Sequence, residues 1–302
     1  MKNPQTDMLV LRAQVLRSLR SFFDGRGFLE VETPLRIPAN APEEHIDPCP
    51  SDDQYLQTSP EMCMKRLLSR GYRRIYQISH CWRYGERGSR HVPEFTMLEW
   101  YRADNDYTAL MRDCEDLLAH VARECLGRTE ITYNDTVIKL AEGADRVTVT
   151  DAFCEVCDEP LSEAIADGSF DEVMVDRIEP SLVRSRPVLL IDYPIQMAAL
   201  ARPKQEDPAV AERFELYAGG LELANGFSEL TDPVEQRRRF QEANQVRQGR
   251  GLPPLPLPEP FLRDLATMPP AAGIALGVDR LVMLLGGATC IDEVLAFTPE
   301  DL

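Results

Sequence analysis

The chain has 302 residues, of which 44% are hydrophobic and 27% charged, and its formal net charge is −17. This composition is globular and excludes a disordered or fibrous chain. No apolar run approaches the roughly 18 residues of a membrane-spanning helix, and the first residues lack the apolar stretch of a signal peptide. Eight cysteines without an export signal indicate reduced thiols, so we expect a cytoplasmic protein with no membrane partner.

The acidic side chains are unevenly distributed. Residues 1–100 carry 14 basic and 13 acidic side chains, whereas the remaining residues carry 19 and 37. The densest acidic stretch is 142–179, which we interpret first as a solvated surface. Overall acidity disfavours broad binding to a phosphate-rich partner such as tRNA. A local basic field is still expected at 65–90, and we expect a partner to meet that segment.

Periodicity and turn residues predict the elements of the first half of the chain. Apolar residues at three- and four-residue steps predict a helix over 8–22, which ends at Asp24-Gly25. Alternation predicts a strand over 28–34 that stops at Pro34. The remaining predictions are a loop at 36–54, a helix at 60–68, strands at 74–82 and 94–103 joined by a basic, glycine-containing loop, and a helix at 107–125.

The second half begins with the acidic stretch 129–180, predicted as short strands and helices. The later elements are a buried strand at 187–194, a hairpin over 213–230 that turns at Gly219-Gly220, a charged helix at 232–247, a polyproline connector at 252–260, and a strand running into a helix over 273–287. There is no internal repeat. Antiparallel hairpins dominate and helices lie toward the ends, so we predict an α+β domain with an antiparallel sheet flanked by helices.

Two arginines and several carboxylates have the surroundings of a binding site. Arg83 leaves a strand beside a glycine-containing loop, and Arg280 lies one turn into a helix, so either planar guanidinium is placed to bind phosphate. Each is also consistent with an ordinary salt bridge. Carboxylates interrupt apolar strands, and such groups must be solvated, paired with a cation or bound to a metal such as Mg²⁺. They are Glu61, Glu99, Glu215, Glu222 and Glu229.

The pair Cys154 and Cys157 has the spacing of half a zinc site. A structural zinc site needs four ligands, usually from two such pairs, and no second pair exists in the sequence. We therefore expect no zinc there, and the role of the two thiols stays open.

Several motifs together resemble the class II aminoacyl-tRNA synthetases. GFLEVETP (27–34) is similar to their motif 1, CWRYGERGSRHVPEFTMLEWY (81–101) to motif 2, and GIALGVDRL (273–281) to motif 3. TSPEMCMKRLL (58–68) and ELANGFSELTDP (222–233) resemble the lysyl-tRNA synthetase branch. The motifs occur in the family's order and span about residues 15–297. The resemblance implies one catalytic domain over 1–302, with an acidic insertion at about 129–180.

The resemblance also implies roles for the matching positions. Arg83 would bind the α-phosphate of ATP, and Arg280 would lie against the γ-phosphate and adenine; these two are the candidate catalytic residues. The other implied ATP ligands are Glu86, His91 and Phe95, with Glu215 and Glu222 holding Mg²⁺. The implied amino-acid pocket comprises Glu61, Glu99, Tyr101, Asn225, Glu229 and Ala275. A diamine substrate brings two ammonium groups that need anionic partners, which fits these carboxylates.

Lysyl-tRNA synthetases carry an anticodon-binding domain before motif 1, but here motif 1 begins at residue 27. The chain therefore resembles the truncated paralogues that attach (R)-β-lysine or lysine to a lysine side chain of translation elongation factor P. Two positions depart from the lysyl-tRNA synthetase pattern: Gly85 displaces the motif 2 acid to Glu86, and Ala275 replaces a glycine. We interpret the Ala275 methyl as narrowing the pocket in favour of a β-amino acid.

Three functions follow from the resemblance. The first is the AMP-forming ligase that modifies elongation factor P. The second keeps the chemistry but loads a tRNA or a small amine, and the third is a regulatory paralogue without catalysis. Retention of Arg83, Arg280, Glu215 and Glu222 disfavours the third. Because motif 1 usually builds a subunit interface in this family, we also expect a homodimer.

Overall fold

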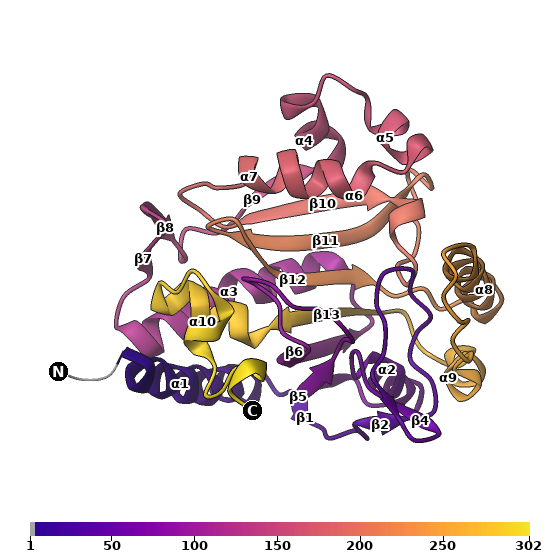
Figure 1. The fold of residues 1–302 in the computed structure, drawn as a ribbon, viewed down its shortest axis with the longest axis horizontal. Coiled ribbons are helices and arrows are strands. Elements are labelled where there is room, and N and C mark those ends of the chain that lie inside the picture. The colour runs from indigo at the N-terminus through magenta and orange to yellow at the C-terminus, as the bar shows by residue number, and fades with distance from the viewer. Residues whose placement is uncertain (1–3) are drawn as a thin grey trace.

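The computed structural model describes residues 4–302, and these residues form one large sheet with helices around it (Figure 1). The strands are β1 (Leu29–Glu30), β2 (Arg36–Ile37), β3 (Pro50–Ser51), β4 (Gln54–Leu56), β5 (Arg74–Trp82), β6 (Glu94–Ala103), β7 (Glu130–Tyr133), β8 (Thr136–Lys139), β9 (Asp145–Thr148), β10 (Val188–Pro194), β11 (Val210–Ala218), β12 (Leu221–Ser228) and β13 (Ala271–Gly277). The α-helices are α1 (Pro4–Asp24), α2 (Glu61–Ser69), α3 (Tyr107–Leu126), α4 (Val149–Val156), α5 (Leu161–Asp167), α6 (Phe170–Val173), α7 (Glu179–Ser181), α8 (Pro233–Gly249), α9 (Glu259–Leu265) and α10 (Val278–Gly286). Short 3₁₀ or π turns occupy Met174–Ile178, Ile195–Met197, Ile291–Val294 and Pro299–Asp301.

The main sheet has eight strands in the order β1-β5-β6-β13-β12-β11-β10-β9. Its six central strands pair antiparallel, which confirms the predicted α+β class. The edges differ from the prediction, because β1 joins β5 and β9 joins β10 in parallel. The sheet is therefore mixed, with an antiparallel centre.

Alternation along the central strands separates an apolar face from a polar face. In β6, Leu98 and Trp100 are fully buried in the main hydrophobic cluster, while Glu99 and Tyr101 alternate with them in sequence. Because successive strand residues point to opposite faces, Glu99 and Tyr101 face away from that cluster. The same pattern in neighbouring strands gives the sheet one face for the core and one for chemistry.

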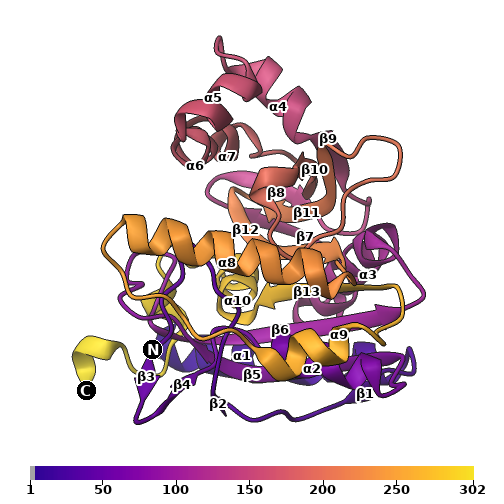
Figure 2. The ribbon, with the colours of Figure 1, turned by 90° about the vertical axis from the view of Figure 1, so that its right-hand side faces the viewer.

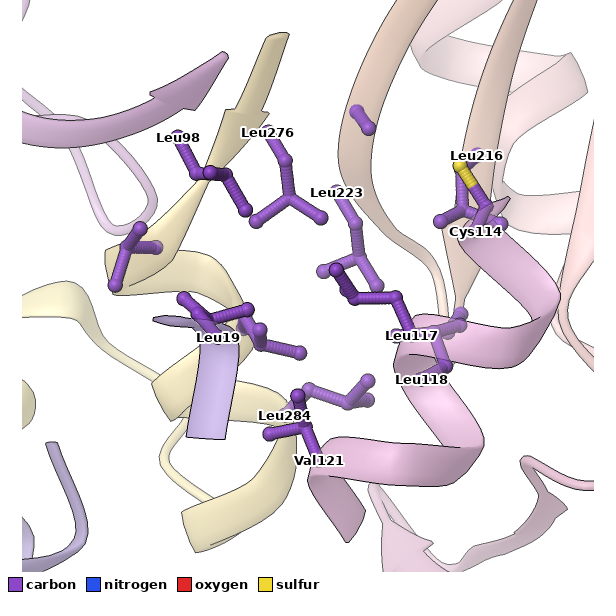
Figure 3. Packing of buried hydrophobic residues seen from close by; sticks show 14 of the residues in the cluster. Leu19, Leu98, Cys114, Leu117, Leu118, Val121, Leu216, Leu223, Leu276 and Leu284 are labelled. Carbon is purple, nitrogen blue, oxygen red and sulfur yellow. The ribbon is translucent and has the colours of Figure 1, made fainter. Parts of the chain in front are cut away.

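Helices α1, α3 and α10 cover the apolar face. Their stripes meet the sheet's leucines in one cluster, which Figure 3 shows at close range between Leu19 of α1, Leu117 and Leu118 of α3, and Leu284 of α10. Burying a leucine side chain contributes about 1.5–3 kcal/mol relative to exposure. This cluster therefore fixes the sheet on which the polar face is displayed.

The opposite side is covered only in part, by α2, α8 and α9 (Figure 2). A second cluster joins Met64 and Leu68 of α2 to Phe240 of α8 and Phe261 of α9. Tyr101 belongs to this cluster as well, so the cluster borders the polar row of the sheet. The polyproline segment before α9 has no helix or strand from Leu252 to Leu257, as predicted.

Helices α4, α5, α6 and α7 lie beyond β10 at one end of the sheet (Figure 1). Their apolar residues form a third cluster with Val188, Leu190 and Tyr193 of β10. The acidic segment therefore has a core of its own against the sheet edge, and β9 within it extends the sheet.

Two expectations about local structure were wrong. The strand expected over 28–34 is paired only at Leu29–Glu30. One more backbone hydrogen bond follows, from Val31 N to the carbonyl of Tyr76, and the pairing ends before Pro34. The loop expected over 36–54 contains β2 and β3, which pair with β4 in a small three-stranded sheet. Such two-residue strands leave no detectable alternation. Among residues 4–302, no helix is long and apolar enough to cross a membrane.

Candidate active site

One row of side chains crosses the polar face of the sheet. Strand register places Glu99 beside Ala275, Ala275 beside Asn225, and Asn225 beside Glu215. Directly opposed residues on neighbouring strands share a face and lie about 4.5–5.5 Å apart at Cβ. Four predicted site residues from four strands are thus brought into line, although up to 176 positions separate them in the sequence.

A bulge adds Glu222 to this face. Residues 222 and 225 are three apart, so a regular strand would put them on opposite faces. The pairing shifts at Leu216/Tyr217, where Leu216 opposes Ala224 but Tyr217 opposes Glu222, leaving Leu223 as the extra residue. An extra residue of this kind redirects the following side chains. Glu222 therefore shares a face with Asn225, and Leu223 turns into the core.

The acid pocket consists of Glu61, Glu99 and Glu229 around the ammonium of Lys65. The Lys65 Nζ lies 3.1 Å from Glu61 Oε2 and 2.7 Å from Glu229 Oε2, and all four side chains are buried. Glu61 and Lys65 are one helical turn apart on α2, which sets the first contact. Although burial would lower it, Glu229 and Glu61 raise the pKa of Lys65. The pocket thus holds three carboxylates and one resident cation.

Glu229 has one oxygen without a partner. The residue is 1% exposed, its Oε2 lies 2.7 Å from the Lys65 ammonium, and its Oε1 accepts no hydrogen bond from residues 4–302. Burial raises the pKa of Glu229 to about 7, against the opposing effect of Lys65. A buried carboxylate oxygen without a donor is costly, so the vacant Oε1 suits a further cationic group.

Glu99 is fixed by two hydroxyl groups. Ser59 Oγ donates to Glu99 Oε2 at 2.8 Å, and Tyr101 donates to Oε1. Burial and the nearby Glu61 raise the pKa of Glu99 to about 8, although both hydrogen bonds oppose this shift. Burial and Glu99 likewise raise the pKa of Tyr101, which keeps its hydroxyl a donor.

The arginine cluster lies next along the same face and contains Arg280, His91 and Glu222, with Arg83 nearby. Arg280 Nη1 donates to Glu222 Oε2 at 3.0 Å, and its Nη2 lies 2.6 Å from His91 Nε2. Burial and Arg280 lower the pKa of His91, so the ring is neutral at neutral pH. Although burial opposes it, Arg280 lowers the pKa of Glu222. The structure thus brings three of the residues expected to bind ATP into direct contact, and their roles stay a prediction.

Helix α10 is anchored so that Arg280 points into the cluster. The adjacent Asp279 is 2% exposed, accepts from Thr96 N at 2.8 Å and pairs with Arg12 at 2.5 Å. These bonds tie α10 to β6 and α1 at once. Arg280 is thereby held by its neighbour in sequence, independently of any ligand.

Arg83 lies at the turn between β5 and β6. Gly85 has a φ of +76°, a conformation that favours glycine, and the turn brings Glu86 Oε1 to 3.8 Å from Arg83 Nη1. The Arg83 guanidinium lies 5.2 Å from the centre of the Phe95 ring. The displaced acid Glu86 therefore contacts the motif 2 arginine in spite of the unusual spacing.

Glu215 already has three donors. Tyr193 and Tyr217 donate to Oε2 at 2.6 and 2.7 Å, and Arg213 Nη2 donates to Oε1 at 2.6 Å. Arg213 also donates to Asn225 Oδ1 at 3.3 Å. Glu215 is therefore held as an ion-paired carboxylate at the border between Asn225 and the arginine cluster.

Glu222 offers an oxygen to a cation. Although burial opposes it, Arg280, Arg83 and Arg213 lower the pKa of Glu222, so this carboxylate is ionised, and one of its oxygens is not engaged by Arg280. Burial together with Glu222 and Glu215 raises the pKa of the neighbouring Glu179, at the start of α7, to about 7. This donor set fits one Mg²⁺ bound largely through phosphate oxygens and water. Within residues 4–302 no three His, Cys, Asp or Glu side chains are grouped as a complete metal site, and Cys154 and Cys157 are free thiols.

The basic segment 65–90 does not form the open patch that the sequence suggested. Lys65 is buried, Arg66 pairs with Asp264, and Arg87 pairs with both Asp292 and Glu300. Lys65 is therefore not available to a partner, and the expectation that a partner meets the rest of this segment stays a prediction. Acidic residues distant in sequence neutralise these cations, which composition within the segment could not reveal.

Sequence analysis missed several residues of the site. Lys65 was counted only as a surface cation, although its position four residues after Glu61 on a helix indicated a pair. Arg213 precedes Glu215 by two residues and so shares its strand face. Tyr193 and Ser59 carried no signal, because only the tertiary structure brings their hydroxyls to Glu215 and Glu99.

Comparison with known proteins agrees with this geometry. The family model for tRNA synthetases class II (D, K and N) matches residues 1–301. The chain belongs to this family. Proteins named elongation factor P–(R)-β-lysine ligase are similar to it: the one from Enterobacter sp. (strain 638) is 40% identical over 97% of this chain and 95% of its own length. The corresponding proteins of Proteus mirabilis (strain HI4320) and Salmonella typhi are 39% and 40% identical over 96% and 97% of this chain.

Proposed function

We propose that this class II synthetase-family protein is an ATP-dependent ligase that activates (R)-β-lysine or lysine and transfers it to a lysine side chain of elongation factor P. The observation that carries the proposal is the acid pocket beside the arginine cluster on one sheet face. A pocket with three carboxylates and one lysine has two negative charges to spare when all are ionised, which matches the two ammonium groups of a lysine isomer. The names of the relatives support the same substrate and acceptor.

The acid pocket would bind the amino acid. Glu229, whose Oε1 has no donor, would receive one ammonium group, and Glu61 and Glu99 would receive the other. Tyr101 orients Glu99, and Asn225 lies toward the carboxylate end of the substrate. Such a site would reject a neutral isostere by roughly 10⁴-fold, because its buried carboxylates would stay unpaired.

The arginine cluster would bind ATP. Arg83 and Arg280 would stabilise the negative charge that develops on the phosphates, with His91 and Glu86 beside them and Phe95 against adenine. Glu222, assisted by Glu215, would hold Mg²⁺. When bound, that ion would neutralise phosphate charge and orient the nucleotide.

The proposed reaction has two steps. The substrate carboxylate attacks the α-phosphorus of ATP, and pyrophosphate leaves with the bonding electrons. The amine of the acceptor lysine then attacks the carbonyl carbon of the adenylate, and AMP leaves. Neither step needs a covalent enzyme intermediate, so positioning and electrostatic stabilisation are the main contributions of the protein.

Ala275 would help to select the β-amino isomer. It lies directly between Glu99 and Asn225 in the strand register, where its methyl group forms part of the pocket floor. The methyl would leave less room for an α-ammonium group beside the reacting carboxyl. We expect A275G to gain activity with α-lysine in ATP–pyrophosphate exchange, and no gain would contradict this role.

Two assays test the proposed function. Exchange of pyrophosphate into ATP that depends on lysine or β-lysine is expected; its absence would favour a regulatory paralogue. Incubation with ATP, β-lysine and the organism's own elongation factor P should increase the mass of the factor by one lysyl unit. An unmodified factor beside a charged tRNA would favour the alternative acceptor.

The assembly belongs to the same proposal. We infer a homodimer of single catalytic domains through the motif 1 surface, where Leu29 is exposed; Leu9 and Val10 are also exposed, on the preceding helix α1. Exposed apolar side chains of this kind favour association. Light scattering coupled to gel filtration should give twice the 34.1 kDa chain mass. We also infer a cytoplasmic location, which accords with the free cysteines and with a role in translation. The acidic segment at about 129–180 would be an insertion in the catalytic domain.

A further inference from the structure

Arg213 of β11 contacts two residues of the proposed site at once. Its Nε donates to Asn225 Oδ1 on β12 at 3.3 Å, and its Nη2 donates to Glu215 Oε1 on its own strand at 2.6 Å. Strands β11 and β12 are neighbours in the main sheet (Figure 1). One side chain thus joins the residue placed at the substrate carboxylate to a residue placed beside Mg²⁺.

The guanidinium of Arg213 is fixed in its orientation. Its Nη1 donates to the carbonyl of Met197, and its central carbon lies 4.3 Å from the centre of the Tyr193 ring. The Tyr193 hydroxyl in turn donates to Glu215 Oε2 at 2.6 Å. A guanidinium that is stacked on a ring and bonded at all three nitrogens has little freedom to turn toward a ligand. Arg213 is therefore held in place by the protein itself, with Nε directed at Asn225.

This contact decides which way the Asn225 amide faces. An arginine has only donors, so the asparagine atom that meets it is the acceptor, Oδ1. The amide nitrogen Nδ2 is then turned away from Arg213, and among residues 4–302 it donates no hydrogen bond. The next position of the polar row is Ala275, followed by Glu99 of the acid pocket. A free amide donor at this place suits an anionic oxygen and not an ammonium group.

We propose that Arg213 is a positioning residue for activation, which orients Nδ2 of Asn225 toward the carboxylate of the bound amino acid; this inference rests on the proposed function. The two ammonium groups of the substrate select the acid pocket, but they do not decide where its carboxylate lies. An oriented donor at Asn225 holds that carboxylate next to the arginine cluster, where it attacks the α-phosphorus. Positioning of this kind favours the reaction because the orientation is set before the reaction begins.

The Nε donor is what distinguishes the two ends of the Asn225 amide. Half a turn about the last side-chain bond exchanges Oδ1 and Nδ2, and the flipped amide would present an oxygen to the substrate carboxylate. Two acceptors that face each other leave the carboxylate without a partner, which lowers affinity at that end of the substrate alone. The role of Arg213 is therefore specific to substrates that carry an ionised carboxyl group.

The test compares R213Q with R213M. Both substitutions remove the charge and the bonds from Nη1 and Nη2. Glutamine carries Nε2 at the same number of bonds from Cα as the arginine Nε, so it keeps a donor for Asn225, whereas methionine has a methyl group at that point. In pyrophosphate exchange the KM for β-lysine should be about tenfold higher in R213M than in R213Q, the effect of one hydrogen bond to a charged group. The KM for ATP should be equal in the two variants, because they change the Glu215 side in the same way.

Three controls separate the orientation of Asn225 from general damage to the site. In an N225A background, R213Q and R213M should have the same KM for β-lysine, because the group to be oriented is gone. The diamine obtained by replacing the carboxyl group of β-lysine with hydrogen should inhibit exchange with the same inhibition constant in both variants. The same two substitutions at Arg202, which pairs with Glu212 at 2.7 Å, should leave the KM for β-lysine at the wild-type value.

The variant N225D tests the same orientation with Arg213 intact. It places an oxygen where Nδ2 should lie, so its KM for β-lysine should exceed that of N225A, because a carboxylate repels the substrate carboxylate and a methyl group does not. A KM equal to that of the wild type would contradict the orientation of the amide. This measurement decides the question even where the substitutions of Arg213 prevent folding.

Equal KM values for β-lysine in R213Q and R213M would overturn the inference. A higher inhibition constant of the diamine in R213M would do so as well, because the acid pocket itself would then be disturbed. A difference that persists in the N225A background would contradict a role through Asn225. Absence of amino-acid-dependent exchange in the wild-type protein would instead refute the proposed function.

Discussion

Replacing Lys65 with methionine should destabilise the protein strongly and in a pH-dependent way. Methionine is similar in length but removes the ammonium group that lies 2.7 Å from Glu229 and 3.1 Å from Glu61. Both carboxylates would stay in a pocket without their cation. Removing one partner of a buried ion pair typically costs about 3–5 kcal/mol, because the other charge is left uncompensated.

The sign of the pH dependence follows from Glu229. Its pKa is about 7 with Lys65 present and would be higher in the variant, whereas in the unfolded chain it is the ordinary value. The folded variant therefore binds the proton more tightly than the unfolded chain. Its stability falls as pH rises from the unfolded pKa through the folded pKa, so the deficit of K65M should be larger at pH ~8 than at pH ~6.

Urea denaturation monitored by tryptophan fluorescence at these two pH values measures the effect. The matched control is K139M, because Lys139 pairs with Glu142 at 3.0 Å on the surface, where such a pair contributes only about 0–1 kcal/mol. A K65M protein as stable as K139M at the higher pH would refute the assignment of Lys65 as the internal counter-ion. So would a deficit independent of pH.

Three further predictions concern the same face of the sheet. The KM for the diamine substrate should fall as pH rises from about 6 to 9, because Glu229 and Glu99, with pKa values of about 7 and 8, bind ammonium only when ionised; a flat profile in pyrophosphate exchange would contradict this. G273A should lower the free energy of unfolding by about 1–3 kcal/mol, because the added methyl would overlap Tyr101 and Glu229, whereas G277A, whose methyl would meet only Arg280 at 3.8 Å, should change the melting temperature much less. R280K should slow activation by about 10²-fold with little change in the KM for the amino-acid substrate. The reason is that the ammonium of the new side chain cannot reproduce the planar guanidinium fork toward Glu222 and phosphate. A wild-type rate of pyrophosphate exchange would place Arg280 outside the reaction.

The sequence predicted the main elements and most of the site because both depend on short-range patterns. Alternation gave the two strands at 74–82 and 94–103 with the bounds that the structure has, and paired glycines marked the hairpin turn at 219–220. The very short strands of the region 36–54 were missed, because two residues are too few to establish a period. The parallel edges of the sheet were missed as well, since strand partners distant in sequence leave no local signal.

The sequence by itself determined which side chains are available: two arginines at motif positions, carboxylates spaced along apolar strands, and an alanine where a glycine is usual. The tertiary structure decided which of them act together. The bulge at Leu223 turns Glu222 onto the face of Asn225, and the packing of α2 inserts Lys65 between Glu61 and Glu229. The net charge of −17 likewise describes the whole chain but not its active site, where charges distant in sequence are compensated within a few ångströms. Coulomb interactions depend on separation in space and on burial, and neither can be read from separation along the chain.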